Sequence, residues 1–135
     1  MPGGGLTPRN VRRIVEAAQP MQASLELLLA QKDWKRAAQA ASNLSELYLT
    51  LGDVAQGLAY AEQSVGLADR SGDAFERMKD RTKLADALHQ AGRLTEAGAA
   101  FREAEEMQKK RQPEFPLLYT VFGFRYCDLF IDKED

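Results

Sequence analysis

The side chains that carry out most enzyme chemistry are scarce in this chain. His89 is the only histidine and Cys127 is the only cysteine among its 135 residues. A zinc site takes three or four nitrogen, sulfur or carboxylate ligands, and two isolated donors do not make one. Cys127 lies in an aromatic run, so we interpret it as a small buried or interface thiol rather than a nucleophile.

Carboxylates are abundant but are not arranged for catalysis. Glu103, Glu105 and Glu106 precede a basic run at 109–111, where cations favour the last turn of a helix, and all of them fit a solvated helix surface. The glycines of residues 1–7 do not form a phosphate loop, because no strand precedes them and no Gly-Lys-Ser/Thr follows. We therefore predict no catalytic residues, no metal and no cofactor, and we do not expect an enzyme.

Composition excludes further classes of function. The net charge of -2 and the shortness of the basic clusters give no reason to expect nucleic acid as a partner. No apolar stretch approaches the ~20 residues that span a bilayer, so no membrane association is predicted. Residues 1–7 lack the charged and apolar regions of a signal peptide, and we interpret them as a flexible lead-in. A cytoplasmic location is the default expectation.

Short turn signals recur every twenty residues and divide the chain into helices. Aspartate can cap the amides that begin a helix, and glycine can take the left-handed conformation that ends one. Because stop and cap are adjacent, consecutive helices are predicted to fold back antiparallel. The signals are Lys32-Asp33, Gly52-Asp53, Gly72-Asp73, Gly92-Arg93 and, in weaker form, Gln112-Pro113.

Apolar residues between the turns recur at spacings of three and four, which indicates an all-α fold. The predicted helices cover 34–51, 54–71, 74–91, 94–111 and 114–131, within a repeat domain at 32–131. An N-terminal helical segment at 8–31 is expected to be broken or kinked near Pro20, since proline removes a backbone donor. Residues 132–135 form an acidic tail. The pairing of the N-terminal helix is left open.

Three stretches carry small and large residues at spacings that let two helices touch. Leu44-Ser45-x2-Tyr48 is followed by Gly57-x3-Ala61, and Leu84-Ala85-x2-Leu88 is followed by Ala97-x3-Phe101; a third begins Tyr119-x2-Phe122-Gly123-x2-Tyr126. Over residues 38–130 this pattern resembles the tetratricopeptide repeat (TPR) family, in a long variety of about forty residues similar to that of bacterial multidomain signalling proteins. The resemblance implies antiparallel hairpins stacked as a right-handed α-solenoid.

The same resemblance implies a protein-protein interaction scaffold that binds a peptide or protein segment, within a larger protein. Chaperone-tail binders of this family clamp a carboxylate with lysine and asparagine, but Glu46 and Asp86 stand where the clamp carries asparagine, which argues against a chaperone adaptor. The alternative is that this face is only solvated surface. The groove residues that the resemblance implies are Ser42, Glu46, Lys79, Thr82, Lys83, Asp86, His89 and Phe124.

The last predicted helix, 114–131, is apolar nearly all round. Such a helix is expected to be buried on more than one side, and solenoids need polar caps at their ends. We therefore predict a homo-oligomer formed through this helix. The alternative function is a self-associating module whose task is to dimerise its parent protein. The expected self-association surface comprises Leu117, Leu118, Phe122, Tyr126 and Phe130.

Overall fold

A computed structural model describes residues 7–111 of the chain, and these residues form five α-helices. They are α1 (Pro8–Ala30), α2 (Trp34–Thr50), α3 (Val54–Ser71), α4 (Ala74–Gln90) and α5 (Leu94–Arg111). The bounds of α2 to α5 agree with the prediction to within one residue, and no strand occurs in 7–111. The predicted helix 114–131 and the acidic tail lie outside the described residues.

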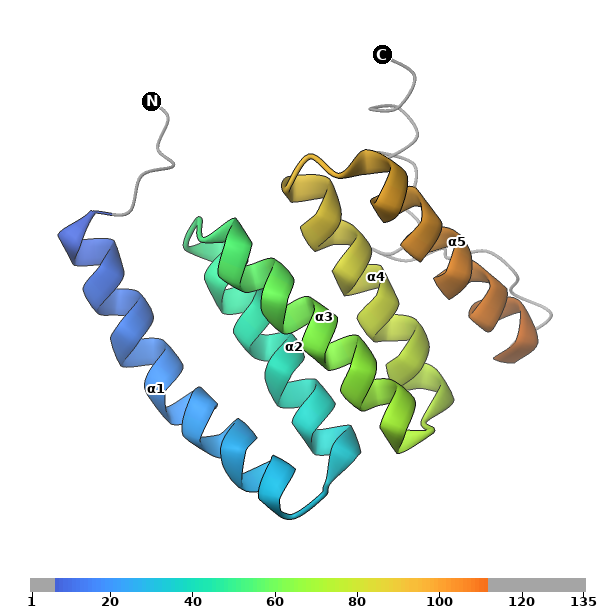
Figure 1. The fold of residues 1–135 in the computed structure, drawn as a ribbon, viewed down its shortest axis with the longest axis horizontal. Coiled ribbons are helices and arrows are strands. Elements are labelled where there is room, and N and C mark those ends of the chain that lie inside the picture. The colour runs from blue at the N-terminus through green and yellow to red at the C-terminus, as the bar shows by residue number, and fades with distance from the viewer. Residues whose placement is uncertain (1–6, 112–135) are drawn as a thin grey trace.

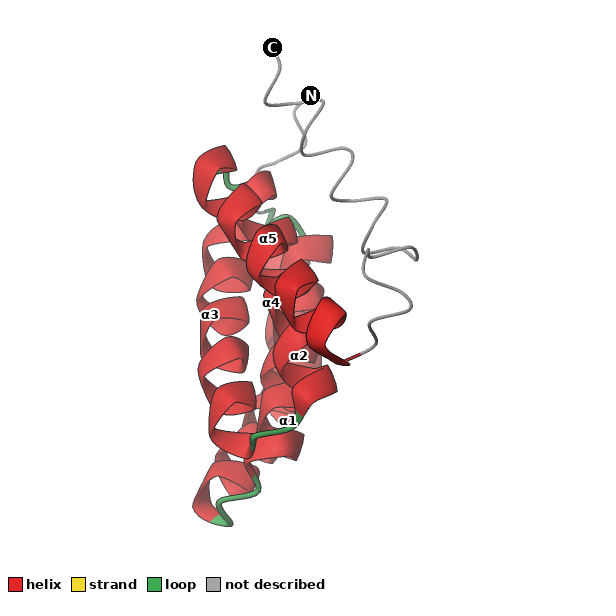
Figure 2. Ribbon diagram, turned by 90° about the vertical axis from the view of Figure 1, so that its right-hand side faces the viewer, coloured by secondary structure: helices red, strands yellow, loops and turns green. Residues whose placement is uncertain are grey.

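The helices follow one another across the molecule, and each reverses the direction of the one before it (Figure 1). Apart from short turns the described chain is entirely helical (Figure 2). α2 packs on α3 and α4 packs on α5 to make two hairpins, while α3 joins α4 and α1 joins α2. α2 and α4 also touch directly. This arrangement is an all-α TPR-like solenoid.

Each turn is built from the predicted pair of residues. The side chains of Asp33, Asp53 and Asp73 accept hydrogen bonds from the amides three positions later, which caps α2, α3 and α4. The residue before each cap lies in the left-handed region, with φ of 90° at Gly52 and 73° at Gly72. Lys32 takes the same conformation at φ 57°, which non-glycine residues of proteins rarely adopt.

The expected break near Pro20 is wrong. α1 is a single helix from Pro8 to Ala30 with Pro20 inside it. Pro20 is exposed, so water can hydrate the carbonyl that loses its helical donor. The opposite face of the helix is held by burial of Ile14, Ala18 and Leu25 in the same apolar core as α2. Packing on both sides of the proline outweighs one missing hydrogen bond.

The two hairpins have separate apolar cores. The first core gathers residues of α1, α2 and α3 around Leu44 and Tyr48, and the second gathers residues of α4 and α5 around Met78 and Phe101. The guanidinium of Arg70, near the end of α3, lies 3.9 Å from the centroid of the Trp34 ring at the start of α2. That contact closes the open end of the first hairpin.

A buried guanidinium connects the hairpins. Arg81 of α4, whose side chain is 8% exposed, donates two hydrogen bonds of 2.8 Å to Asp69 of α3 and one of 2.8 Å to Glu103 of α5. The hydrogen bond from Arg81 lowers the pKa of Asp69, and a second from Arg77 adds to the effect against the opposing effect of burial. Three helices are thereby tied at one side chain.

The crossing of α2 over α3 depends on the absence of a side chain at Gly57. The Ser45 hydroxyl donates a 2.7 Å hydrogen bond to the Gly57 carbonyl, and a Cβ at position 57 would lie 2.6 Å from Leu49 side-chain carbons. In the second hairpin Ala85 and Ala97 hold the corresponding small positions, and both are fully buried. The small residues that motivated the family resemblance therefore lie in the helix contacts.

Alanine substitution at two glycines of α3 tests this close approach. A Cβ at Gly66 would meet nothing within 4 Å, so Gly66→Ala should stabilise the protein by about 0.5–1 kcal/mol through helix propensity. Gly57→Ala has the same propensity gain but must displace Leu49, so it should be about 1–3 kcal/mol less stable than Gly66→Ala. Urea denaturation measures both. Equal stability of the two variants would contradict the close crossing.

Candidate functional site

α2 and α4 run side by side in parallel and are joined by a regular series of polar contacts. Lys35 Nζ lies 3.1 Å from Asp73 Oδ2, and Lys83 Nζ lies 2.7 Å from Glu46 Oε1. Between them, Gln39 Nε2 donates to Glu76 Oε1 at 3.3 Å. The partners differ by 38 positions in the first pair (73 − 35) and by 37 in the others (83 − 46 and 76 − 39). A constant offset is what two parallel helices of equal rise produce.

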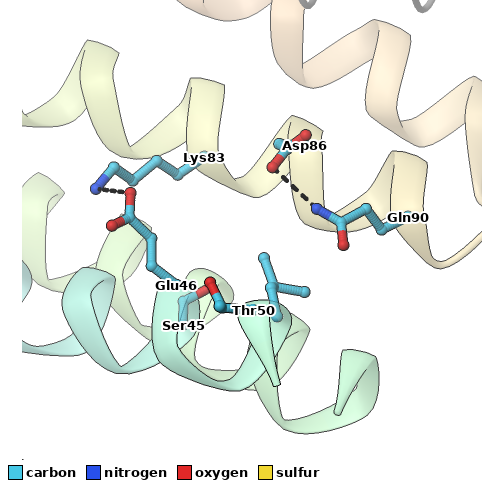
Figure 3. Close-up of a pocket in the computed structure, with 7 residues that line it drawn as sticks. Ser45, Glu46, Thr50, Lys83, Asp86 and Gln90 are labelled. Atoms are coloured by element: carbon cyan, nitrogen blue, oxygen red, sulfur yellow. Dashed lines mark hydrogen bonds and ion pairs between the residues drawn. The ribbon is translucent and has the colours of Figure 1, made fainter. Parts of the chain in front are cut away.

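A pocket of about 360 Å³ opens between the C-terminal halves of these two helices. In Figure 3 the Lys83 and Glu46 side chains reach toward each other across it, and Gln90 donates a 3.1 Å hydrogen bond to Asp86 along α4. Leu49 is an apolar part of the lining. The lining residues are Ser45, Glu46, Leu49, Thr50, Lys83, Asp86 and Gln90.

The structure brings three of the expected groove residues together in this pocket: Glu46, Lys83 and Asp86. Ser42 and Thr82 are 1% exposed, so they lie in the helix packing and not on the groove surface. Thr82 donates its hydroxyl hydrogen to the Lys79 carbonyl at 2.6 Å.

Two other expected groove residues lie away from the pocket lining. Lys79 forms a 3.2 Å ion pair with Glu76. His89 is half-buried and does not line the pocket. Phe124 and the expected self-association residues Leu117, Leu118, Phe122, Tyr126 and Phe130 lie outside the described residues.

Sequence reasoning missed a pair of buried carboxyl groups beside the pocket. Glu76 and Asp80 stand one turn apart on α4 and are 1% and 0% exposed. If both were ionised, Asp80 Oδ1, Asp80 Oδ2 and Glu76 Oε2 would have no hydrogen-bond donor among the described residues, and the buried Ser42 Oγ of α2 has no partner there either. A proton on Asp80 supplies the missing donor by a hydrogen bond to Glu76.

The surroundings of Asp80 favour this protonated form. Burial raises the pKa of Asp80 to about 9, and the hydrogen bond with Glu76 and the charge of that carboxylate add to the shift, against the opposing charges of Lys79 and Lys83. The only sequence signal was the i, i+4 spacing of two acids on a helix, which is equally typical of a solvated face.

The family comparison bears on the same two helices. The family model of the tetratricopeptide repeat matches residues 38–71, which cover most of α2 and all of α3, and residues 81–111, which cover the C-terminal part of α4 and all of α5. The chain belongs to the tetratricopeptide repeat family. The pocket therefore lies between the first helices of two consecutive TPR repeats. Comparisons with curated proteins and with solved structures gave no match.

The helices and the acidic side chains of residues 7–111 bear on two further classes of site. No helix within this range is long and apolar enough to cross a membrane. No group of three or more histidine, cysteine or acidic residues in the same range is placed to hold a metal ion.

The protonated Asp80 predicts how stability depends on pH. The unfolded chain releases this proton near pH 3.9 while the folded chain keeps it to about pH 9, so the free energy of unfolding should fall as pH rises between these values, by at most about 1.4 kcal/mol per pH unit. Asp80→Asn removes this titration. Its stability relative to the wild type should rise steadily from pH 5 to pH 9, as measured by urea denaturation.

Asp69→Asn is the control with the opposite sign. The pKa of Asp69 is lowered in the folded state, so its stabilisation is present above its unfolded pKa and is lost as pH falls through the folded value. Asp69→Asn should therefore be least stable relative to the wild type at neutral pH, and the difference should shrink in acid. A wild-type pH profile that runs parallel to that of Asp80→Asn would show that Asp80 is ionised in the fold.

Proposed function

We propose that this chain is a protein-protein interaction module in which the pocket between α2 and α4 receives part of a peptide or protein segment. TPR repeats generally mediate protein-protein interaction, and the family is a non-enzymatic scaffold. The observation that carries the proposal is the position of the pocket between the first helices of the two repeats. Its volume of about 360 Å³ falls at the lower end of the range of ~300–1,000 Å³ typical of ligand pockets.

The lining suits a segment that brings both polar and apolar contacts. Glu46 is 57% exposed at its side chain although it is paired with Lys83, and Thr50 and Gln90 are exposed at the rim. Leu49, half-buried, offers apolar contact below them. A cytoplasmic location, membership of a larger protein and kinship with the long-repeat TPR proteins of bacterial signalling belong to the same proposal.

Selection from a random dodecapeptide library at pH 7 tests the proposed function. The full chain should enrich specific peptides, and Thr50→Trp, which fills the pocket rim, should reduce binding of those peptides at least tenfold. Arg102→Trp places the same bulk on the exposed surface of α5 and should leave binding unchanged. Peptides that bind Thr50→Trp as well as the wild type would place the interaction elsewhere, and failure to enrich any peptide would count against the function itself.

The alternative function is self-association through residues 117–131, and it is carried by their sequence alone. Burying four large apolar side chains against a partner contributes on the order of 6–12 kcal/mol before the costs of association. Sedimentation of the full chain at low micromolar concentration should then show a dimer, which the double substitution Phe124→Glu/Phe130→Glu should dissociate. A monomeric wild type, with a variant that behaves identically, would contradict self-association.

A further inference from the structure

The buried carboxyl pair lies in the contact between α2 and α4 that forms the groove. Glu76 accepts a hydrogen bond from the Gln39 side chain of α2. The next polar contact between the two helices is the ion pair of Glu46 with Lys83, in the lining of the pocket. Asp80 stands between these two links, one turn after Glu76. At the constant offset of 37, Ser42 of α2 falls level with residues 79–80 of α4, and its hydroxyl is also buried without a partner among the described residues.

The cations near this pair already have acidic partners. On α4, Lys79 is 3.2 Å from Glu76 Oε1 and Lys83 is 2.7 Å from Glu46 Oε1. On α2, the neutral side chain of Gln39 donates to Glu76, and the carboxylate of Glu46 pairs with Lys83. From α3, Asp69 pairs with Arg77 and Arg81 of α4, and from α5, Glu103 also pairs with Arg81.

An ionised Asp80 would therefore add a second carboxylate charge beside Glu76, fully buried and without a cation of its own. Hydration of that charge requires α2 and α4 to separate, whereas Lys83, three residues after Asp80 on the same helix, would approach it by leaving Glu46 of α2. With a proton on Asp80, a hydrogen bond from this carboxyl group to Glu76 joins the two side chains and removes one buried charge, so the helices stay in contact.

We propose that the separation of α2 and α4, and hence the width of the groove, is controlled by one proton held between Glu76 and Asp80. Loss of the proton to solvent leaves two carboxylates that repel each other and admit water. Lys83 then moves from Glu46 toward Asp80, which opens the mouth of the pocket. The consequence for partner binding rests on the proposed function, whereas the movement of the helices does not.

The architecture allows this opening without unfolding. α2 is held to α3 by the first core and α4 is held to α5 by the second, and no residue is shared between the buried sets of the two cores. The contact between α3 and α4, with Arg81 tied to Asp69, remains as the hinge. The α2–α4 contact is smaller than the contact within either hairpin, so it is the joint that yields.

Distances between spin labels on the two walls of the groove test the proposal. Cysteines introduced at Thr50 and Gln90, with Cys127→Ser, carry the labels. Between pH 6 and pH 9.5 the distance distribution should shift to longer values, and the same labels on Asp80→Asn should show no shift. Glu76→Gln, which removes the like charge and can donate to Asp80, should move the midpoint to lower pH. A second pair at Gln90 and Arg102, within one hairpin, should not respond.

Two kinds of result would contradict the proposed opening of the groove. No shift in the labelled wild type, or an equal shift in Asp80→Asn, would overturn the proposal. A loss of helical circular dichroism over the same pH range would also overturn it, since it would indicate unfolding rather than opening.

Amide chemical shifts of the unlabelled chain provide a second measurement that does not depend on the introduced cysteines. Amides of 39–50 and 76–90 should titrate with one common midpoint, and independent midpoints would count against a single shared proton. Neither measurement uses a partner, so a failed peptide selection would leave this result standing.

Discussion

The left-handed residue followed at once by a helix cap is the constraint on which the rest of the structure depends. At Gly52-Asp53 and Gly72-Asp73 the chain ends one helix and begins the next within three and two residues, respectively. So short a connection leaves consecutive helices no choice but to lie antiparallel and in contact along their lengths. The pairing of α2 with α3 and of α4 with α5 follows, and so does the parallel course of α2 and α4, which are separated by two reversals.

The parallel course of α2 and α4 gives the groove its regularity. Side chains separated by 37 or 38 positions meet repeatedly along the two helices, from Lys35 and Asp73 at one end to Glu46 and Lys83 at the other. A substitution on one helix therefore has an identifiable partner on the other. The groove can be understood as a set of paired positions rather than as a surface patch.

Helix caps and helix bounds, which depend on neighbouring residues, could be predicted from the sequence. The side chains that are buried between helices distant in the sequence could not. Asp33 and Gly52 act within a few residues of themselves, so their roles and the helix bounds were predictable. The expectation that Pro20 breaks the helix was wrong, because it considered only the backbone next to the proline. The burial of the opposite face of α1 against other helices cannot be known from those neighbouring residues. Glu76 and Asp80 were missed for a related reason, since an i, i+4 pair of acids has the same spacing whether water or another helix covers it. Ser42 and Thr82 were expected in the groove, but their positions on the helices turn them into the packing instead.

The cation over the Trp34 ring also makes the two hairpins distinguishable to an optical measurement. Trp34 is the only tryptophan of the chain, and Arg70 holds it at the open end of the first hairpin, apart from the core of α4 and α5. Its fluorescence therefore reports on the first repeat alone, whereas far-ultraviolet ellipticity averages over all helices. Any difference between the two unfolding curves would be a direct measure of how independently the second repeat melts.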